Sequence, residues 1–232
     1  MIQEATTKAQ TRRVRPRPAA TLVLLREGAG GLEVLMGRRA LKHRFMPGKM
    51  VFPGGRVDAS DAAGPADGPP PEPGAAILRR RWGERRAFAP ALAAIRETYE
   101  ETGLLVGRAV SDTDMSVAPA PWAPFEAAGL TPAVSRLKLI ARAITPASRP
   151  MRFDTWFFMA RAEELDLGGT ERPSAELEEV AWFPLATAHK EDCPRITEAM
   201  LAEINRRVRA PEDEPPMFVR TIKEKSVRVT LT

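Results

Sequence analysis

The order of apolar segments constrains the fold of this 232-residue chain more than any other feature. Runs rich in aliphatic and β-branched residues predict strands at 19–27, 32–38, 49–52, 104–106, 136–144, 153–161, 177–182 and 226–231. Helices are predicted at 75–82, 88–102, 184–189 and 194–208. The principal elements follow the order β-β-β-α-β-β-β-α. This order predicts an α/β (α+β) layered domain in which helices pack on a mixed central sheet.

Proline and glycine indicate where the chain leaves this pattern. Residues 61–74 contain only Ala, Gly, Pro, Asp and Glu, with five prolines among them. Such a stretch is incompatible with a core helix or strand, because proline lacks the backbone N–H group. We therefore expect a Pro-rich insertion, exposed in this stretch and extending over about 59–87. The remaining organisation is a flexible basic tail at 1–18 and a single domain at 19–232.

Composition excludes several classes of protein. One cysteine, Cys193, cannot form an internal disulfide, and no run of about 18 apolar residues exists to span a membrane. The first residues lack the apolar core of a secretory signal, and the last three are not a peroxisomal tripeptide. The cytoplasm is therefore the expected location. The net charge of +5 is concentrated in basic clusters at 8–17 and 79–86, which either attract phosphates or form solvated surface.

Three glutamates give the helix at 88–102 its chemical character. Glu97, Glu100 and Glu101 occur at spacings i, i+3 and i+4, so they share one helix face. Like charges this close repel each other, and Mg²⁺ or Mn²⁺ would offset the repulsion while keeping waters and room for substrate phosphates. The alternative is an exposed acidic face that pairs with Arg96 and solvent.

Together with Phe52-Pro53-Gly54-Gly55, this helix resembles the Nudix box. That pattern is glycine, five residues, glutamate, seven residues, and then arginine–glutamate–aliphatic–any–glutamate–glutamate–any–glycine–aliphatic. The matching residues are Gly55, Arg96, Glu97, Glu100, Glu101, Gly103 and Leu104. The chain departs from the pattern at Thr98, which occupies a usually aliphatic position, and in length, because 34 residues separate Asp61 from Arg96. Asp61 stands where the first glutamate belongs, and Asp58 competes for that role.

The resemblance implies a Nudix-like α/β/α sandwich and a metal-dependent diphosphatase. It implies that Glu97, Glu100, Glu101 and the Gly55 carbonyl hold Mg²⁺ or Mn²⁺. Catalysis would involve Glu97, Glu100, Glu101 and Arg96, with Glu100 or Glu101 taking a proton from the attacking water and Arg96 orienting a carboxylate. The preferred metal and the identity of the general base stay open.

A second resemblance lies upstream, in the signature of Nudix coenzyme A diphosphatases. This signature has five parts at fixed intervals: an arginine, a small residue, a second arginine, a glycine and the Phe-Pro-Gly-Gly run. Arg39, Ala40, Arg44, Gly48 and the run starting at Phe52 fit this spacing. The implied substrate-binding residues are Arg38, Arg39, Arg44, Gly48, Phe52, Gly54 and Gly55. Arginine suits this role because its planar fork binds phosphate in a bidentate manner; the alternative is that these arginines are surface charge.

The implied substrate is a small nucleoside diphosphate derivative. Coenzyme A or acyl-coenzyme A would yield 3′,5′-ADP and (acyl-)4′-phosphopantetheine. The alternatives are ADP-ribose, NADH or another dinucleotide, a non-catalytic Nudix-fold ligand sensor, and an RNA-cap hydrolase. Nucleic acid is the less favoured partner, because no aromatic-interleaved RNA motif accompanies the basic tail. No membrane partner is expected, and a homodimer contact through the insertion stays open.

Overall fold

A computed structural model describes residues 14–43, 45–109, 120–210, 214–222 and 225–231. Its helices are α1 (Gly74–Trp82), α2 (Ala89–Thr102), α3 (Ala123–Ala127) and α4 (Arg195–Arg207). Its strands are β1 (Arg17–Gly28), β2 (Gly31–Arg39), β3 (Met50–Val51), β4 (Gly54–Arg56), β5 (Leu104–Ala109), β6 (Leu130–Pro132), β7 (Lys138–Ile144), β8 (Phe153–Arg161), β9 (Asp166–Gly169), β10 (Leu177–Pro184), β11 (Met217–Ile222) and β12 (Lys225–Thr230). In the described ranges, none of these helices has the length and apolar character needed to span a membrane.

One large sheet organises the molecule. In the described chain it has nine strands, with the path β10-β2-β1-β8-β7-β11-β12, while β3 pairs with β2 and β4 pairs with β1. The β1–β8 and β7–β11 pairs are parallel and the other pairs are antiparallel, so the sheet is mixed. A smaller sheet has the order β6-β5-β9. The mixed sheet predicted from the sequence is confirmed.

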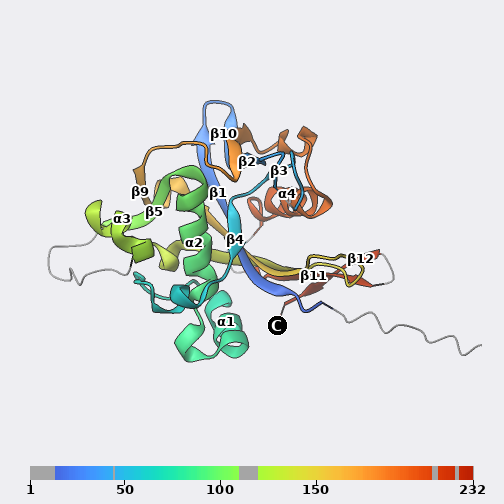
Figure 1. The fold of residues 1–232 in the computed structure, drawn as a ribbon, viewed down its shortest axis with the longest axis horizontal. Coiled ribbons are helices and arrows are strands. Elements are labelled where there is room, and N and C mark those ends of the chain that lie inside the picture. Colours follow the sequence, from blue (N-terminus) through green and yellow to red (C-terminus); the bar gives the residue numbers. More distant parts are fainter. Residues whose placement is uncertain (1–13, 44, 110–119, 211–213, 223–224, 232) are drawn as a thin grey trace, which may run out of the picture.

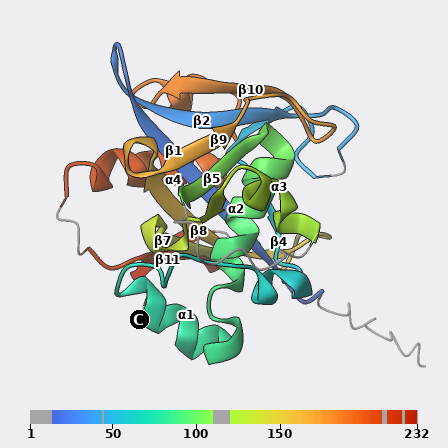
Figure 2. The ribbon, with the colours of Figure 1, turned by 90° about the vertical axis from the view of Figure 1, so that its left-hand side faces the viewer.

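Helices cover both faces of the large sheet. Alternate residues of β1 point to opposite faces, as the two-residue period of a strand requires. Leu22 and Leu24 pack in the core with α1, α2 and α3, whereas Val23 and Leu25 pack in a second core with α4. Figures 1 and 2 show α2 and α4 on opposite sides of the central strands. The fold is therefore the α/β/α sandwich that the sequence predicted.

The helix ends agree closely with the sequence, and the short elements agree less well. The helices predicted at 75–82, 88–102 and 194–208 and the strand predicted at 153–161 are found within one residue of their bounds. The helix predicted at 184–189 is wrong, because the chain forms a turn and then a 3₁₀ helix at Ala188–Lys190. Strands β4, β6, β9 and β11 and helix α3 were not predicted. Strand β4 has three residues, two of them glycine, so no periodic pattern could reveal it.

The Pro-rich insertion is more integrated into the fold than its composition suggests. Asp61 lies in a 3₁₀ helix at Ala59–Ala63 and is fully buried, so the expectation of an exposed stretch is wrong there. Farther along, Ile77 and Leu78 of α1 belong to the core that contains α2. Asp67 accepts hydrogen bonds from the backbone and hydroxyl of Ser135, which attaches the Pro-rich stretch to the domain.

Helix α4 is attached to the strand that follows it by a buried ion pair. Glu203 and Arg207 are each 3% exposed, and Nε of Arg207 donates to Oε1 of Glu203 at 2.6 Å. The same guanidinium donates to the carbonyls of Glu214 and Pro215, just before β11. Burial alone would raise the pKa of Glu203, but hydrogen bonds from Arg206 and Arg207 outweigh burial and hold the pKa below its ordinary value.

Glu203→Gln is expected to lower the free energy of unfolding near neutral pH by about 1–3 kcal/mol, because it leaves Arg207 without its charged partner. A depressed carboxylate pKa adds stability above the ordinary pKa of glutamate, and that stability is lost as the pH falls through the folded-state value. The difference between wild type and variant should therefore shrink on acidification. Urea unfolding at about pH 7 and about pH 3 measures this, and a pH-independent difference would contradict it.

Candidate active site

Helix α2 starts and ends where local backbone chemistry requires. Pro90 stands in its first turn, where the missing N–H group is not needed. Gly103 ends the helix with φ +79°, and its N–H donates to the Tyr99 carbonyl. Thr98 is buried, and its hydroxyl donates to the Ala94 carbonyl at 2.7 Å. The departure from an aliphatic residue is therefore accommodated within the helix, and the glutamates keep their register.

Glu101 is the most enclosed of the three glutamates. It is 3% exposed, and its Oε2 accepts a hydrogen bond from the Gly54 N–H at 2.8 Å. Its Oε1 is buried without a hydrogen-bond partner in the described structure. Burial raises the pKa of Glu101 to about 8, although the charge of Arg39 and the Gly54 hydrogen bond act in the opposite direction. An oxygen buried in this way would be stabilised by a cation.

Glu97 and Glu100 share one guanidinium nitrogen of Arg96. Nη1 of Arg96 donates to Oε1 of Glu97 at 2.9 Å and to Oε2 of Glu100 at 3.1 Å. Burial raises the pKa of Glu97 to about 7, and the neighbouring Arg96 charge limits the increase. The Glu100 side chain is 50% exposed, so it is the glutamate most accessible to solvent.

Arg96 is held by five hydrogen bonds, the number of N–H donors that a guanidinium has. Besides the two glutamates, Nε and Nη2 donate to the two Asp61 oxygens at 2.8 and 3.1 Å, and Nη2 donates to the Arg56 carbonyl. The Asp61 side chain is 1% exposed and that of Arg96 is 6% exposed. Asp58, the competing candidate, donates its backbone N–H to the Asp61 side chain and accepts the Asp61 backbone N–H at its own carbonyl. Asp61 thus orients Arg96, and Arg96 in turn orients the glutamates.

Gly54 and Gly55 allow the chain to pass very close to these groups. A Cβ atom on Gly54 would lie 2.5 Å from the Ala20 carbonyl oxygen and 2.7 Å from the Thr21 Cα. A Cβ atom on Gly55 would lie 2.3 Å from the carboxyl carbon of Glu97. The backbone at the paired glycines therefore lies so close to α2 and β1 that side chains larger than hydrogen would clash there.

Gly55→Ala is expected to lower turnover by about a hundredfold, because the Glu97 carboxylate must move by more than a bond length. The thermal midpoint should change little, since the end of a side chain yields more easily than backbone. Gly30→Ala is the matched control, because nothing lies within 4 Å of a Cβ atom at Gly30. Steady-state kinetics and calorimetry on both variants give the comparison. Full activity in Gly55→Ala would contradict this account of the glycine.

The upstream arginines do not act as one group. Arg39 lies in the same cleft as α2, and its Nη1 donates to the His43 ring at 3.1 Å from Nε2. Arg38 lies outside the cleft lining and donates to Glu179 of β10 at 2.8 Å. Gly48 turns the following loop with φ +70°, and its carbonyl accepts a hydrogen bond from Arg38. Arg44 lies outside the described residues.

A cleft of about 1760 Å³ brings most of the predicted site together. Of the predicted residues it is lined by Arg39, Phe52, Gly54, Gly55, Arg96, Glu97 and Glu100. Glu101 lies behind Gly54. The wall also has many apolar side chains, among them Phe45, Met46, Met151, Phe153, Phe157 and Ile196. Ligand pockets commonly measure roughly 300–1,000 Å³, so this cleft suits a long ligand with polar and apolar parts.

Two parts of the cleft wall were not identified from the sequence. They are the connection between β7 and β8, at 145–152, and the first turn of α4. Neither segment carries a short motif, and only tertiary packing brings them to α2. Phe157, in the strand predicted at 153–161, is 5% exposed, belongs to the core on the α4 side and also lines the cleft.

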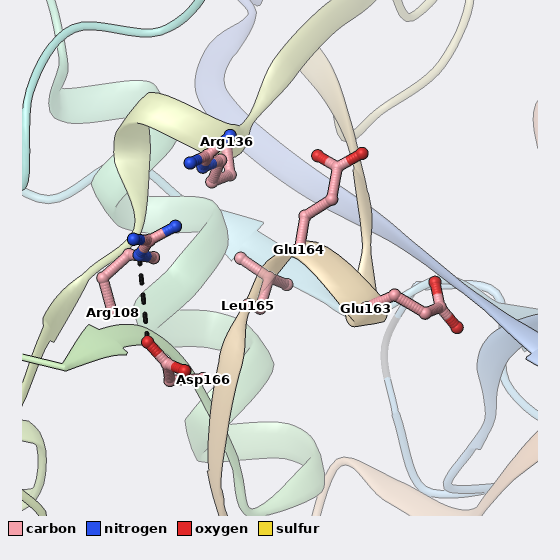
Figure 3. A pocket seen from close by; sticks show the side chains of 6 residues that line it. All are labelled: Arg108, Arg136, Glu163, Glu164, Leu165 and Asp166. Carbon is pink, nitrogen blue, oxygen red and sulfur yellow. Dashed lines mark ion pairs between the residues drawn. The ribbon is translucent and has the colours of Figure 1, made fainter.

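A smaller pocket of about 340 Å³ lies elsewhere and contains none of the predicted site residues. Figure 3 shows its six lining residues, with Arg108 and Asp166 3.8 Å apart as an ion pair. Arg136, Glu163 and Glu164 give it mixed charge. Nothing in this arrangement resembles a reaction centre.

The donors around α2 fit a divalent cation. Across the described ranges, no three His, Cys, Asp or Glu side chains are gathered as a preformed cage. Mg²⁺ does not require one, because it commonly uses one or two carboxylates and completes its octahedron with water and substrate phosphates. The unpartnered oxygen of Glu101, and the pKa values of Glu97 and Glu101 that burial raises, indicate carboxylates whose negative charge the protein compensates only in part.

Comparison with known proteins identifies similar sequences and structures. A crystallised NUDIX hydrolase from Alicyclobacillus acidocaldarius is 33% identical, with a TM-score of 0.64, over 82% of this chain and 91% of that chain. The Caenorhabditis elegans protein "Putative nudix hydrolase 7" is 29% identical over 176 residues. That match covers 72% of this chain but 51% of the relative, so the chain spans about half the length of this curated relative.

A more distant structure shows the fold alone. The NUDIX domain of Shewanella oneidensis NrtR, solved with ADP ribose, is 13% identical, with a TM-score of 0.50, over 84% of this chain and 90% of that one. No family model matches the chain. The Alicyclobacillus acidocaldarius hydrolase, by contrast, is more than 30% identical to this chain over 91% of its own length. With the α2 glutamates, the paired glycines and the sandwich fold in place, this chain belongs to the Nudix hydrolase family.

Proposed function

We propose that the protein hydrolyses a diphosphate that links a nucleoside to another moiety, with coenzyme A or acyl-coenzyme A as the favoured substrate. One observation carries the proposal. The buried, unpaired carboxylate of Glu101 lies beside Glu97 and Glu100 at the polar end of a cleft that also holds Arg39. Carboxylates of this kind suit a divalent cation, and an arginine suits a phosphate.

Glu97, Glu101 and the Gly55 carbonyl would hold Mg²⁺ or Mn²⁺, with Glu100 close by. Such an ion lowers the pKa of bound water and offsets charge that develops on phosphate oxygens. Arg39, whose charge acts on Glu101, binds the diphosphate. Glu100 or Glu101 accepts the proton of the attacking water. Arg96 keeps Glu97 and Glu100 in position, since all its N–H groups are already bonded to protein.

Size and polarity support a coenzyme A derivative over a compact nucleotide. A pantetheine arm with an acyl chain is long and partly apolar, and the cleft has an apolar wall on which such a group can lie. Arg39, Gly48 and the Phe52–Gly55 run also fit the coenzyme A signature in the sequence. ADP-ribose, NADH and binding without turnover are the alternatives that the assay below separates.

The test is turnover of coenzyme A, acyl-coenzyme A, ADP-ribose and NADH with Mg²⁺ or Mn²⁺, with products identified by mass. We expect 3′,5′-ADP and the matching phosphopantetheine, at a higher kcat/KM than for the other substrates. Preferred cleavage of ADP-ribose or NADH would overturn the coenzyme A assignment while retaining the metal site. No turnover of any of the four, with Mn²⁺ shown to bind, would contradict the hydrolytic proposal and favour a ligand sensor.

A further inference from the structure

Helix α4 begins inside the cleft without a side-chain cap. Pro194, Arg195, Ile196 and Thr197 all line the cleft, and the capping position is Pro194, which has no side-chain acceptor. The first bonded amide of the helix is that of Glu198, which donates to the Pro194 carbonyl. In the described structure the N–H groups of the three preceding residues have no acceptor. A helix start of this kind carries partial positive charge and attracts anions.

Thr197 provides a second, independent indication of a ligand. It is 5% exposed and lines the cleft, yet its hydroxyl has no hydrogen-bond partner within the described residues. Other buried threonines of the molecule behave differently, since the hydroxyls of Thr98 and Thr102 donate to helix carbonyls at 2.7 and 2.6 Å. The Thr197 side chain is therefore largely buried and lines the cleft with a hydroxyl that no described residue engages, so this hydroxyl can donate to an anion bound there.

The charges around this helix start also favour an anion. Arg195 is exposed on the cleft and makes no ion pair among the described residues. The nearby acids are compensated, because Asp192 pairs with Lys49 at 2.5 Å and Glu191 lies 3.9 Å from Arg38. Glu198 belongs to the same helical turn but does not line the cleft.

We propose that Arg195, Ile196 and Thr197 form a second anion site, the α4 anion site, which binds a phosphomonoester that the substrate carries away from its diphosphate. The proposal rests on the proposed function, because it assumes that the diphosphate lies at the α2 glutamates. Helices α2 and α4 lie in opposite layers of the sandwich (Figure 1), and residues of both line the same cleft. A substrate with a third phosphate would therefore contact both layers at once.

Binding of product-like nucleotides tests the site without turnover. Isothermal titration with Mg²⁺ would compare 3′,5′-ADP with 5′-AMP, which lacks the second phosphomonoester. Wild type is expected to bind 3′,5′-ADP about tenfold more tightly, because charge-assisted hydrogen bonds are strong. Arg195→Gln should remove most of this preference and Thr197→Val part of it. Arg209→Gln, at an exposed arginine just beyond the far end of α4, should leave the preference unchanged.

The outcomes separate the two proposals. Equal affinity of wild type for both nucleotides, or an undiminished preference in Arg195→Gln, would overturn the α4 anion site. If the wild type cleaves coenzyme A but gives one of these two binding results, the proposed function is still supported and only the α4 anion site is refuted. A preference lost in Arg195→Gln, in a protein that does not cleave coenzyme A, would support the anion site and refute the proposed substrate.

Discussion

Glu101→Gln is expected to lower turnover by about a thousandfold or more while the protein stays folded. The amide keeps the size of the side chain and an oxygen for the Gly54 N–H, but it removes the negative charge that would hold the cation. Because burial raises the pKa of Glu101 to about 8, the loss of this charge should not weaken the metal-free fold. Single-turnover kinetics and calorimetry without metal measure the two effects separately.

The matched control is Glu178→Gln, an exposed glutamate on β10 that should tolerate the change. Mn²⁺ titration of both variants adds a readout that does not depend on the substrate. Weakened Mn²⁺ binding in Glu101→Gln alone is the expected result. An active Glu101→Gln enzyme with unaltered Mn²⁺ affinity would refute the assignment of this residue.

Arg96→Met is expected to lower the free energy of unfolding by about 3–5 kcal/mol, because it leaves the buried Asp61 carboxylate without a counter-charge. For a chain of this size, that corresponds to a fall of about 10 °C in the thermal midpoint. Activity should fall as well, since Glu97 and Glu100 lose the group that orients them. Urea unfolding and calorimetry measure the loss of stability.

Two further variants make the Arg96 prediction specific. Arg96→Lys keeps the charge but not the planar fork, so it should recover only part of the stability. Arg85→Met removes an exposed arginine from the insertion and should have almost no effect. If Arg96→Met were as stable as Arg85→Met, the five hydrogen bonds of Arg96 would not be stabilising the site.

Local signals explain why helix α2 and the shared face of its glutamates could be predicted from the sequence. Pro90 and Gly103 determine the ends of the helix, and the spacing of the glutamates determines the face that they share. The strand at 153–161 was equally clear, because its apolar run is continuous. Each of these features depends on residues within about one helical turn or strand of each other.

The features that could not be predicted from the sequence are those that depend on tertiary structure. Arg38 and Arg39 are adjacent on β2, so strand alternation directs them to opposite faces, but the sequence does not say which face holds the cleft. From the sequence, Asp58 and Asp61 are both candidates for the position of the first glutamate in the motif. The structure distinguishes them, because a 3₁₀ helix buries Asp61. The start of α4 reaches the cleft only through the packing of a distant layer.

The ionic contact between Asp61 and Arg96 has a consequence for how much the chain between them can vary. The 34 intervening residues form a closed loop whose two ends are joined by this contact, so the insertion can lengthen or shorten without separating the pair. A deletion that starts after Asp61 would retain the support of the reaction centre, whereas one that starts three residues earlier would remove it. In this chain, the boundary of the segment whose length can vary is thus a single buried carboxylate.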